Sequence, residues 1–140
     1  MTARVERAFS VSAPPETVWE FIADPANRAR AISVVDQFDT DENTTTWHIS
    51  LPIPVVSKTI RVRTRTVELT PPEYVRFEGN SRIFDVLGEH RVVPEGDTTK
   101  IVNTFTVDGH APGVEGFFRR NLDGEIKNLE QTLLDYLDEQ

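Results

Sequence analysis

The chain has 140 residues, no cysteine and a formal net charge of −8 at pH 7. This length predicts one domain, residues 1–140, with a hydrophobic core of its own. The lack of cysteine excludes disulfides and thiolate metal sites. The negative charge opposes nonspecific binding to nucleic acid. The first residues are charged, and no apolar run approaches the roughly 20 residues that span a bilayer. We therefore expect a cytoplasmic protein without a transmembrane segment.

The basic residues are strongly biased towards arginine, because only Lys58, Lys100 and Lys127 are lysines. Acidic, lysine-poor surfaces suit concentrated salt, which screens their self-repulsion. One hypothesis is therefore a halophilic source, and the other is an ordinary acidic cytoplasmic protein. An unfolding midpoint that rises with molar KCl would favour the first.

The N-terminal part of the chain predicts one strand and two short helices. Residues 4–12 alternate between apolar and polar side chains, which indicates a strand with one buried face. Pro15 suits the first turn of a helix over residues 15–23. Asp24 can cap a second helix that starts at Pro25 and ends near Ala31.

Six further stretches predict strands in hairpin order, because their side chains alternate and polar or proline-rich turns separate them. They are residues 32–38, 44–51, 58–69, 74–79, 83–93 and 99–107.

The chain ends in a long predicted helix that runs from Pro112 or Gly113 to Leu137. Its apolar residues recur at steps of three and four, which predicts one buried stripe. They are Val114, Phe117, Phe118, Leu122, Ile126, Leu129, Leu133, Leu134 and Leu137. Such a stripe needs a partner surface, so the fold class is α+β, with this helix across a curved antiparallel sheet of about seven strands.

Gly124 interrupts the helical pattern, because a glycine inside a helix costs about 0.5–1 kcal/mol relative to alanine. Close packing or simple tolerance is one interpretation. Room for a ligand, or a bend in the helix, is the other.

The run VSAPPETVW at residues 11–19, followed by ADP at residues 23–25, resembles the START/Bet v 1-like (SRPBCC) superfamily. There, this run links the first strand to two short helices of the helix-grip fold. The sequence is most similar to the polyketide cyclase/dehydrase and CoxG-like group, over essentially the whole chain. The resemblance implies a deep, mostly apolar cavity between sheet and long helix that holds lipids, sterols, polyketides or other hydrophobic molecules. It does not settle activity.

The candidate ligand-binding residues are those on the inward parity of the strands and on the helix stripe. This mostly apolar set with a few polar groups is typical of ligand pockets, although the same residues could simply fill a core. They are Phe9, Trp47, Ile49, Val62, Thr64, Phe77, Phe84, Val86, Asn103, Phe105, Phe118 and Leu122.

Three arginines of one strand, Arg61, Arg63 and Arg65, share the parity opposite to its apolar residues. We therefore expect them on the outer face, near acidic residues of neighbouring strands, where exposed ion pairs contribute little. Those acidic residues are Glu78, Asp85 and Glu89.

The histidines show no metal-ligand spacing, so no metal site is predicted from them. His90 shares the parity of Phe84 and Val86, which makes it the candidate general acid or base. His48 is expected to face outward, and His110 to lie at the surface where the long helix begins.

We interpret the chain as a binding or transport protein for a small hydrophobic ligand, such as a lipid, polyketide or isoprenoid-like molecule. Asn103, Thr64 or His90 would orient the ligand, and Asp36 or Arg82 would hold a polar head group at the cavity mouth. One alternative is a polyketide cyclase/dehydratase that uses His90. Another is a CoxG-like accessory subunit of a redox enzyme, with a protein partner. No cofactor is expected.

Overall fold

The structure, a computed structural model, describes residues 2–53 and 58–138. Its elements are β1 (Thr2–Val11), α1 (Pro15–Ile22), α2 (Pro25–Ala31), β2 (Val35–Asp41), β3 (Thr44–Ile49), β4 (Ile60–Thr70), β5 (Tyr74–Asn80), β6 (Phe84–Glu95), β7 (Thr98–Gly109) and α3 (Val114–Asp138).

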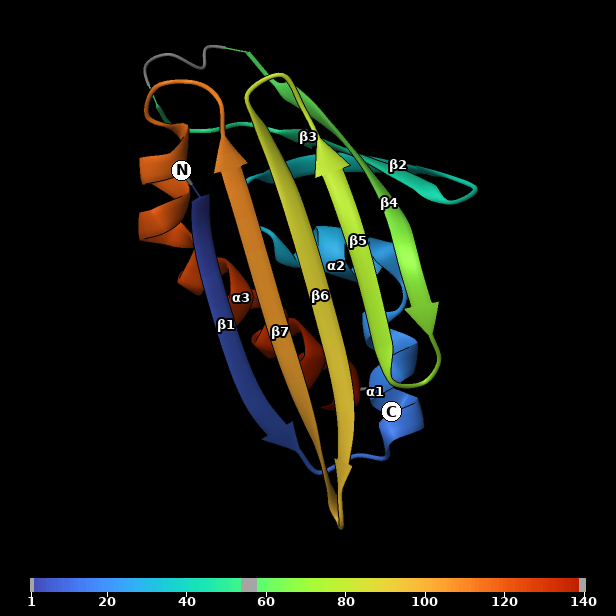
Figure 1. Cartoon of the computed structure of the whole chain (residues 1–140). Coiled ribbons are helices and arrows are strands. Elements are labelled where there is room, and N and C mark those ends of the chain that lie inside the picture. Colours follow the sequence, from blue (N-terminus) through green and yellow to red (C-terminus); the bar gives the residue numbers. More distant parts are fainter. Residues whose placement is uncertain (1, 54–57, 139–140) are drawn as a thin grey trace.

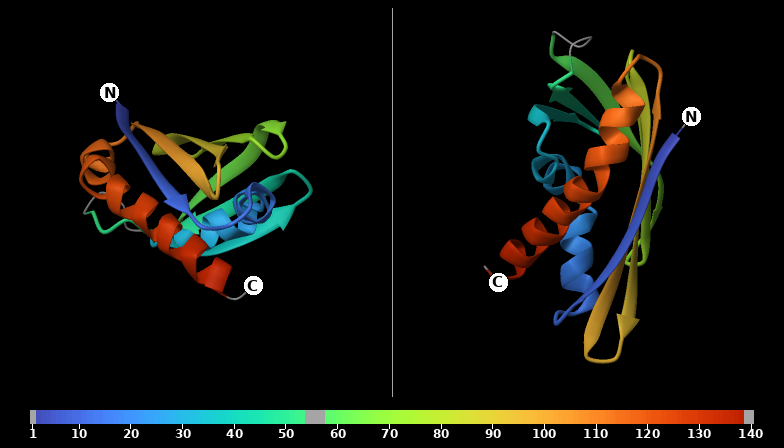
Figure 2. Two further views of the ribbon diagram at one scale, coloured as in Figure 1. Left: turned by 90° about the horizontal axis from the view of Figure 1, so that it is seen from below. Right: turned by 90° about the vertical axis from the view of Figure 1, so that its left-hand side faces the viewer.

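The strands form one antiparallel sheet in the order β1-β7-β6-β5-β4-β3-β2. The sheet curves, and the three helices lie on one side of it, with α3 running across β1 and β7 (Figures 1 and 2). The predicted α+β helix-grip architecture is therefore confirmed. Among residues 2–53 and 58–138, no helix is both long enough and apolar enough to cross a membrane.

The core lies between the inner face of the sheet and the helices. Seven of the apolar residues expected on the α3 stripe are buried: Val114, Phe117, Phe118, Leu122, Ile126, Leu129 and Leu133. Leu134 is 42% exposed, so its assignment to the stripe was wrong. It is the residue next to buried Leu133, and one helical step of about 100° turns it away from the sheet.

A polar contact joins α3 to the first strand. Arg7 shares the inner parity of β1 with Val5 and Phe9, and it forms ion pairs with Glu130 at 2.9 Å and Asp123 at 3.3 Å. The one charged residue in this apolar series thus lies at the rim, where α3 supplies carboxylates.

The largest boundary difference concerns β2, which was predicted over residues 32–38 but spans Val35–Asp41. Residues 32–34 instead form a turn that connects α2 to the sheet. The hairpin turn between β2 and β3 falls at Glu42 and Asn43, where Glu42 has a φ of 53°. The other strand ends lie within two residues of prediction.

The outer face of β4 carries Arg61, Arg63 and Arg65, all exposed as predicted. The expected ion pairs are not formed: within the described residues, none of these arginines pairs with the acidic groups proposed for them. Asp85 accepts from Asn80, and Glu89 accepts from Tyr74. Both donors lie on β5, which is the strand adjacent to β6.

Candidate functional site

A small cavity lies between the sheet, α3 and the turn at residues 32–34. Its volume is about 30 Å³ and its walls are apolar. Its lining residues are Ile32, Val34, Trp47, Ile49, Phe84, Val86, Phe105, Val107, Phe118, Leu122 and Glu125. That space suits one or two water molecules, whereas ligand pockets usually measure about 300–1,000 Å³. Side chains therefore fill most of the deep cavity that the resemblance implied.

Aromatic rings occupy much of that space. The ring of Phe118 on α3 lies 4.9 Å from that of Phe84 on β6 and 5.2 Å from that of Phe117, centroid to centroid. Deeper in the core, the Phe77 ring contacts Trp47 at 5.8 Å and Phe105 at 6.0 Å. These contacts are edge-on or tilted, the arrangement that aromatic pairs prefer.

Seven of the twelve candidate residues line the cavity: Trp47, Ile49, Phe84, Val86, Phe105, Phe118 and Leu122. Of the other five, Val62, Phe77 and Asn103 are fully buried elsewhere in the core. The Thr64 hydroxyl donates to the Thr45 carbonyl at 2.7 Å, and Phe9 packs against the core from β1 while half-buried.

A buried polar pair adjoins the cavity. His90 and Asn103 are direct partners across β6 and β7, and His90 Nδ1 lies 2.7 Å from Asn103 Oδ1. His90 Nε2 and Asn103 Nδ2 are buried and have no hydrogen-bond partner within the described residues. The His90 ring meets Phe105 edge-on at 5.6 Å, and Phe105 also lines the cavity. The Phe105 ring thus lies between the polar pair and the cavity.

His90 is neutral at physiological pH. Burial, with a smaller effect from the positive charge of Arg28, lowers the pKa of His90 to about 3. A histidine of this kind is not protonated to imidazolium near neutral pH and is a weak base, which opposes the acid–base role predicted for it.

Arg28 is a buried cation that sequence reasoning missed. Its guanidinium donates to the Ile22 carbonyl at 2.8 Å and lies 4.8 Å from the centroid of the Phe77 ring. Burial lowers the pKa of Arg28 to about 10, so it stays charged at neutral pH. In sequence it is one of two arginines in a short polar helix, and nothing there indicates that Phe77 lies beneath it.

Glu125 is a second buried charged residue that was missed. It accepts a hydrogen bond from the backbone N–H of Ser33 at 2.6 Å and another from the Ser33 hydroxyl. These bonds tie residues 32–34, which wall the cavity, to α3. A signal existed in the sequence: Glu125 follows Leu122 by three residues and precedes Leu129 by four, so it lies on the apolar stripe.

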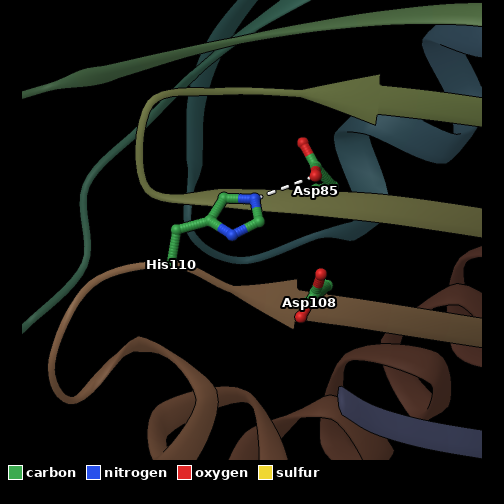
Figure 3. Close-up of side chains that lie close together, drawn as sticks. All are labelled: Asp85, Asp108 and His110. Carbon is green, nitrogen blue, oxygen red and sulfur yellow. Dashed lines mark hydrogen bonds and ion pairs between the residues drawn. The ribbon is translucent and has the colours of Figure 1, made fainter. Parts of the chain in front are cut away.

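A second polar group lies on the outer face of the sheet and comprises Asp85, Asp108 and His110, which we call the outer triad (Figure 3). His110 Nε2 lies 2.8 Å from Asp85 Oδ2, and Asn80 Nδ2 donates to Asp85 Oδ1 at 2.9 Å. The Asn80 hydrogen bond is the main cause of a lowered Asp85 pKa, with His110 contributing less.

The remaining polar candidates lie away from the cavity. His48 faces outward as expected and contacts Asp39 at 3.0 Å. Asp36 is exposed and accepts from the Ser50 hydroxyl at 2.5 Å. Arg82 is also exposed and borders a shallow outer depression with His48. Neither Asp36 nor Arg82 lines the cavity.

Comparison with known proteins identifies the family. Residues 2–133 match the family described as polyketide cyclase/dehydrase and lipid transport. The chain belongs to this family. No curated protein matches its sequence.

Solved structures of similar fold include the Zhui aromatase/cyclase from Streptomyces sp. R1128, with a TM-score of 0.74 and 16% identity over 97% of this chain and 94% of that one. A START superfamily protein from Mycobacterium smegmatis has a TM-score of 0.75 and 12% identity over 97% of both chains. A protein from Thermus thermophilus has a TM-score of 0.65 and 21% identity over 99% of this chain and 95% of that one. At these identities the likeness establishes the SRPBCC fold alone.

Proposed function

We propose that this family member binds a small hydrophobic ligand between α3 and the inner face of the sheet. The observation that carries the proposal is the apolar cavity, which marks where α3 and the sheet leave the core incompletely filled. Burial of apolar ligand surface would drive binding. The family description includes lipid transport, which agrees with a binding role.

Ligand entry requires the walls to move, because about 30 Å³ cannot hold a lipid or polyketide. The wall at residues 32–34 is the best candidate for this movement, because it is a short turn rather than a central strand. Within the part of the chain that the structure describes, its hydrogen bonds to α3 run from Ser33 to the Glu125 carboxylate. Separation of Ser33 from Glu125 would open a path between the turn and the helix.

The His90–Asn103 pair would orient a polar group on the ligand. With His90 Nδ1–H donating to Asn103 Oδ1, His90 Nε2 is an acceptor and Asn103 Nδ2 a donor. A ligand hydroxyl can satisfy both atoms at once. Phe105 contacts His90 and lines the cavity, so movement of its ring would connect the cavity with the His90–Asn103 pair.

A cyclase or dehydratase activity is the second candidate, supported by the family description and by the unsatisfied polar pair in the core. It ranks below binding because His90, with a pKa of about 3, is poorly suited to acid–base work near neutral pH.

The test measures the affinity of N-phenyl-1-naphthylamine, a neutral apolar probe whose fluorescence rises on burial. Phe118→Arg places a charge in the cavity wall and should weaken probe binding at least tenfold. Asn128→Arg, an identical addition on the exposed face of α3, should leave affinity unchanged. Leu122→Phe, which fills the cavity without adding charge, should also weaken binding. Equal affinity in the wild type and in a folded Phe118→Arg or Leu122→Phe variant would overturn the proposal.

A further inference from the structure

The outer triad has the composition and spacing of a metal-binding group, and it lies on the face of the sheet opposite to the cavity. We propose that Asp85, Asp108 and His110 bind a divalent transition metal, with Zn²⁺ as the best-fitting ion. This site is independent of ligand binding in the cavity.

The backbone brings the three side chains together. Asp85 on β6 and Asp108 on β7 are direct partners in the antiparallel register, so their side chains leave the same face side by side. His110 follows Asp108 by two residues and returns to that face. Its backbone N–H donates to the Ile83 carbonyl at 2.8 Å, which holds this segment against the start of β6. Figure 3 shows the imidazole beside both carboxylates.

The distances are close to those that a metal requires. Two neighbouring donors bound to Zn²⁺ at about 2.0–2.1 Å lie about 2.8–3.0 Å apart in octahedral geometry and about 3.3–3.4 Å apart in tetrahedral geometry. His110 Nε2 and Asp85 Oδ2 are already 2.8 Å apart, and ligand atoms of all three residues lie within 4.8 Å of one another. A small separation of the first pair and a side-chain rotation of Asp108 would complete three-point coordination.

A neighbouring residue orients one of the ligands. Asn80 donates to Asp85 Oδ1 at 2.9 Å, which leaves Oδ2 directed at His110. Such outer hydrogen bonds position metal-bound carboxylates in established sites.

The donor set selects among metals. Calcium and magnesium prefer sites built from oxygen, whereas one imidazole nitrogen with two carboxylate oxygens suits zinc and its transition-metal neighbours. The imidazole is what distinguishes this group from an ordinary acidic patch. All three residues are at least partly accessible, so water can complete the coordination. The protein's charge of −8 further favours a cation.

The test is a calorimetric titration of the untagged full chain with ZnCl₂, together with the absorption spectrum of the Co²⁺ form. One ion per chain is expected. His110→Gln and Asp108→Asn should each raise the dissociation constant at least tenfold. His48→Gln is the matched control, because His48 also contacts an aspartate, Asp39, at 3.0 Å on the outer face of this sheet. It should change the dissociation constant less than twofold.

Three results would overturn the proposal: no saturable binding below millimolar Zn²⁺, wild-type affinity in Asp108→Asn, or an equal loss in His48→Gln. Excess Mg²⁺ or Ca²⁺ should not displace the zinc, and displacement by either would contradict the assigned metal class. Circular dichroism of each variant checks that the fold is retained.

Discussion

Strands β6 and β7 bring polar side chains together on both faces of the sheet, in opposite environments. On the inner face His90 contacts Asn103 at 2.7 Å, and on the outer face Asp85 opposes Asp108 and contacts His110 at 2.8 Å. His90 is fully buried and its pKa falls to about 3, whereas His110 is exposed. The same residue type is thus held neutral on one face and is open to solvent and ions on the other.

The largest expected effect comes from acid acting on the inner pair. Unfolded His90 takes up a proton below about pH 6.5, but folded His90 does so only near pH 3. The unfolded state therefore binds more protons between these values, and the unfolding free energy should fall by about 1.4 kcal/mol per pH unit as pH decreases through this window. Urea denaturation of the wild type and His90→Gln at several pH values measures this slope.

His90→Gln should show a shallower slope from pH 6.5 to pH 3, because proton uptake by the unfolded His90 side chain no longer contributes. His110→Gln provides the control and should retain most of the wild-type slope. Identical slopes in the wild type and His90→Gln would contradict the lowered pKa of buried His90.

The next effect contrasts the two faces of β4. Val62 is fully buried and Arg63 beside it is exposed. Val62→Ala removes two methyl groups from the core and should lower the unfolding free energy by about 2 kcal/mol. Arg63→Ala should change it by less than about 0.5 kcal/mol. Chemical denaturation measures the unfolding free energy of both variants. A similar loss of unfolding free energy in the two would mean that Arg63 makes stabilising contacts on the outer face.

The sequence could predict which residues of the sheet face the core and which face outward, because strand side chains alternate and β4 and β6 keep that alternation. The long helix could be predicted from the spacing of its apolar residues, and the fold class followed from one amphipathic helix beside many strands. The cavity lining was only partly predictable. Inward parity does not tell which residues α3 covers, and Val62 and Phe77 therefore lie in the packed core while Ile32 and Val34 wall the cavity.

The charged residues were hardest to predict, because their surroundings come from distant segments. Arg28 is buried through Phe77 of β5, and the outer triad exists only through the register of β6 and β7. Neither contact leaves a local pattern in the sequence. Glu125 differs, because its place on the apolar stripe of α3 was visible and marked it as a buried carboxylate.

Gly124 offers a smaller test on the exposed side of α3. A Cβ built there meets no atom within 4 Å, so close packing does not explain this glycine. Gly124→Ala should raise the unfolding free energy by about 0.5–1 kcal/mol, because alanine loses less conformational entropy in a helix. Thermal or urea unfolding measures the gain.

Gly88 is the matched position on the inner face of the sheet. A Cβ at Gly88 would lie 2.1 Å from a Phe77 ring carbon, so Gly88→Ala should destabilise the protein. A loss of stability in Gly124→Ala as well would favour the alternative interpretation, in which the helix bends at Gly124.

The smallest effect belongs to the outer triad in metal-free protein. Asp85→Asn removes the ion pair with His110, whose side chain is 41% exposed, and should cost at most about 1 kcal/mol with EDTA present. Because the pair is exposed, the cost should shrink as NaCl rises from low to molar concentration. Urea denaturation of the wild type and variant at both salt concentrations tests this. A larger, salt-independent cost would mean that the outer pair is shielded from solvent like His90 and Asn103, and the contrast between the two faces of β6 and β7 would then fail.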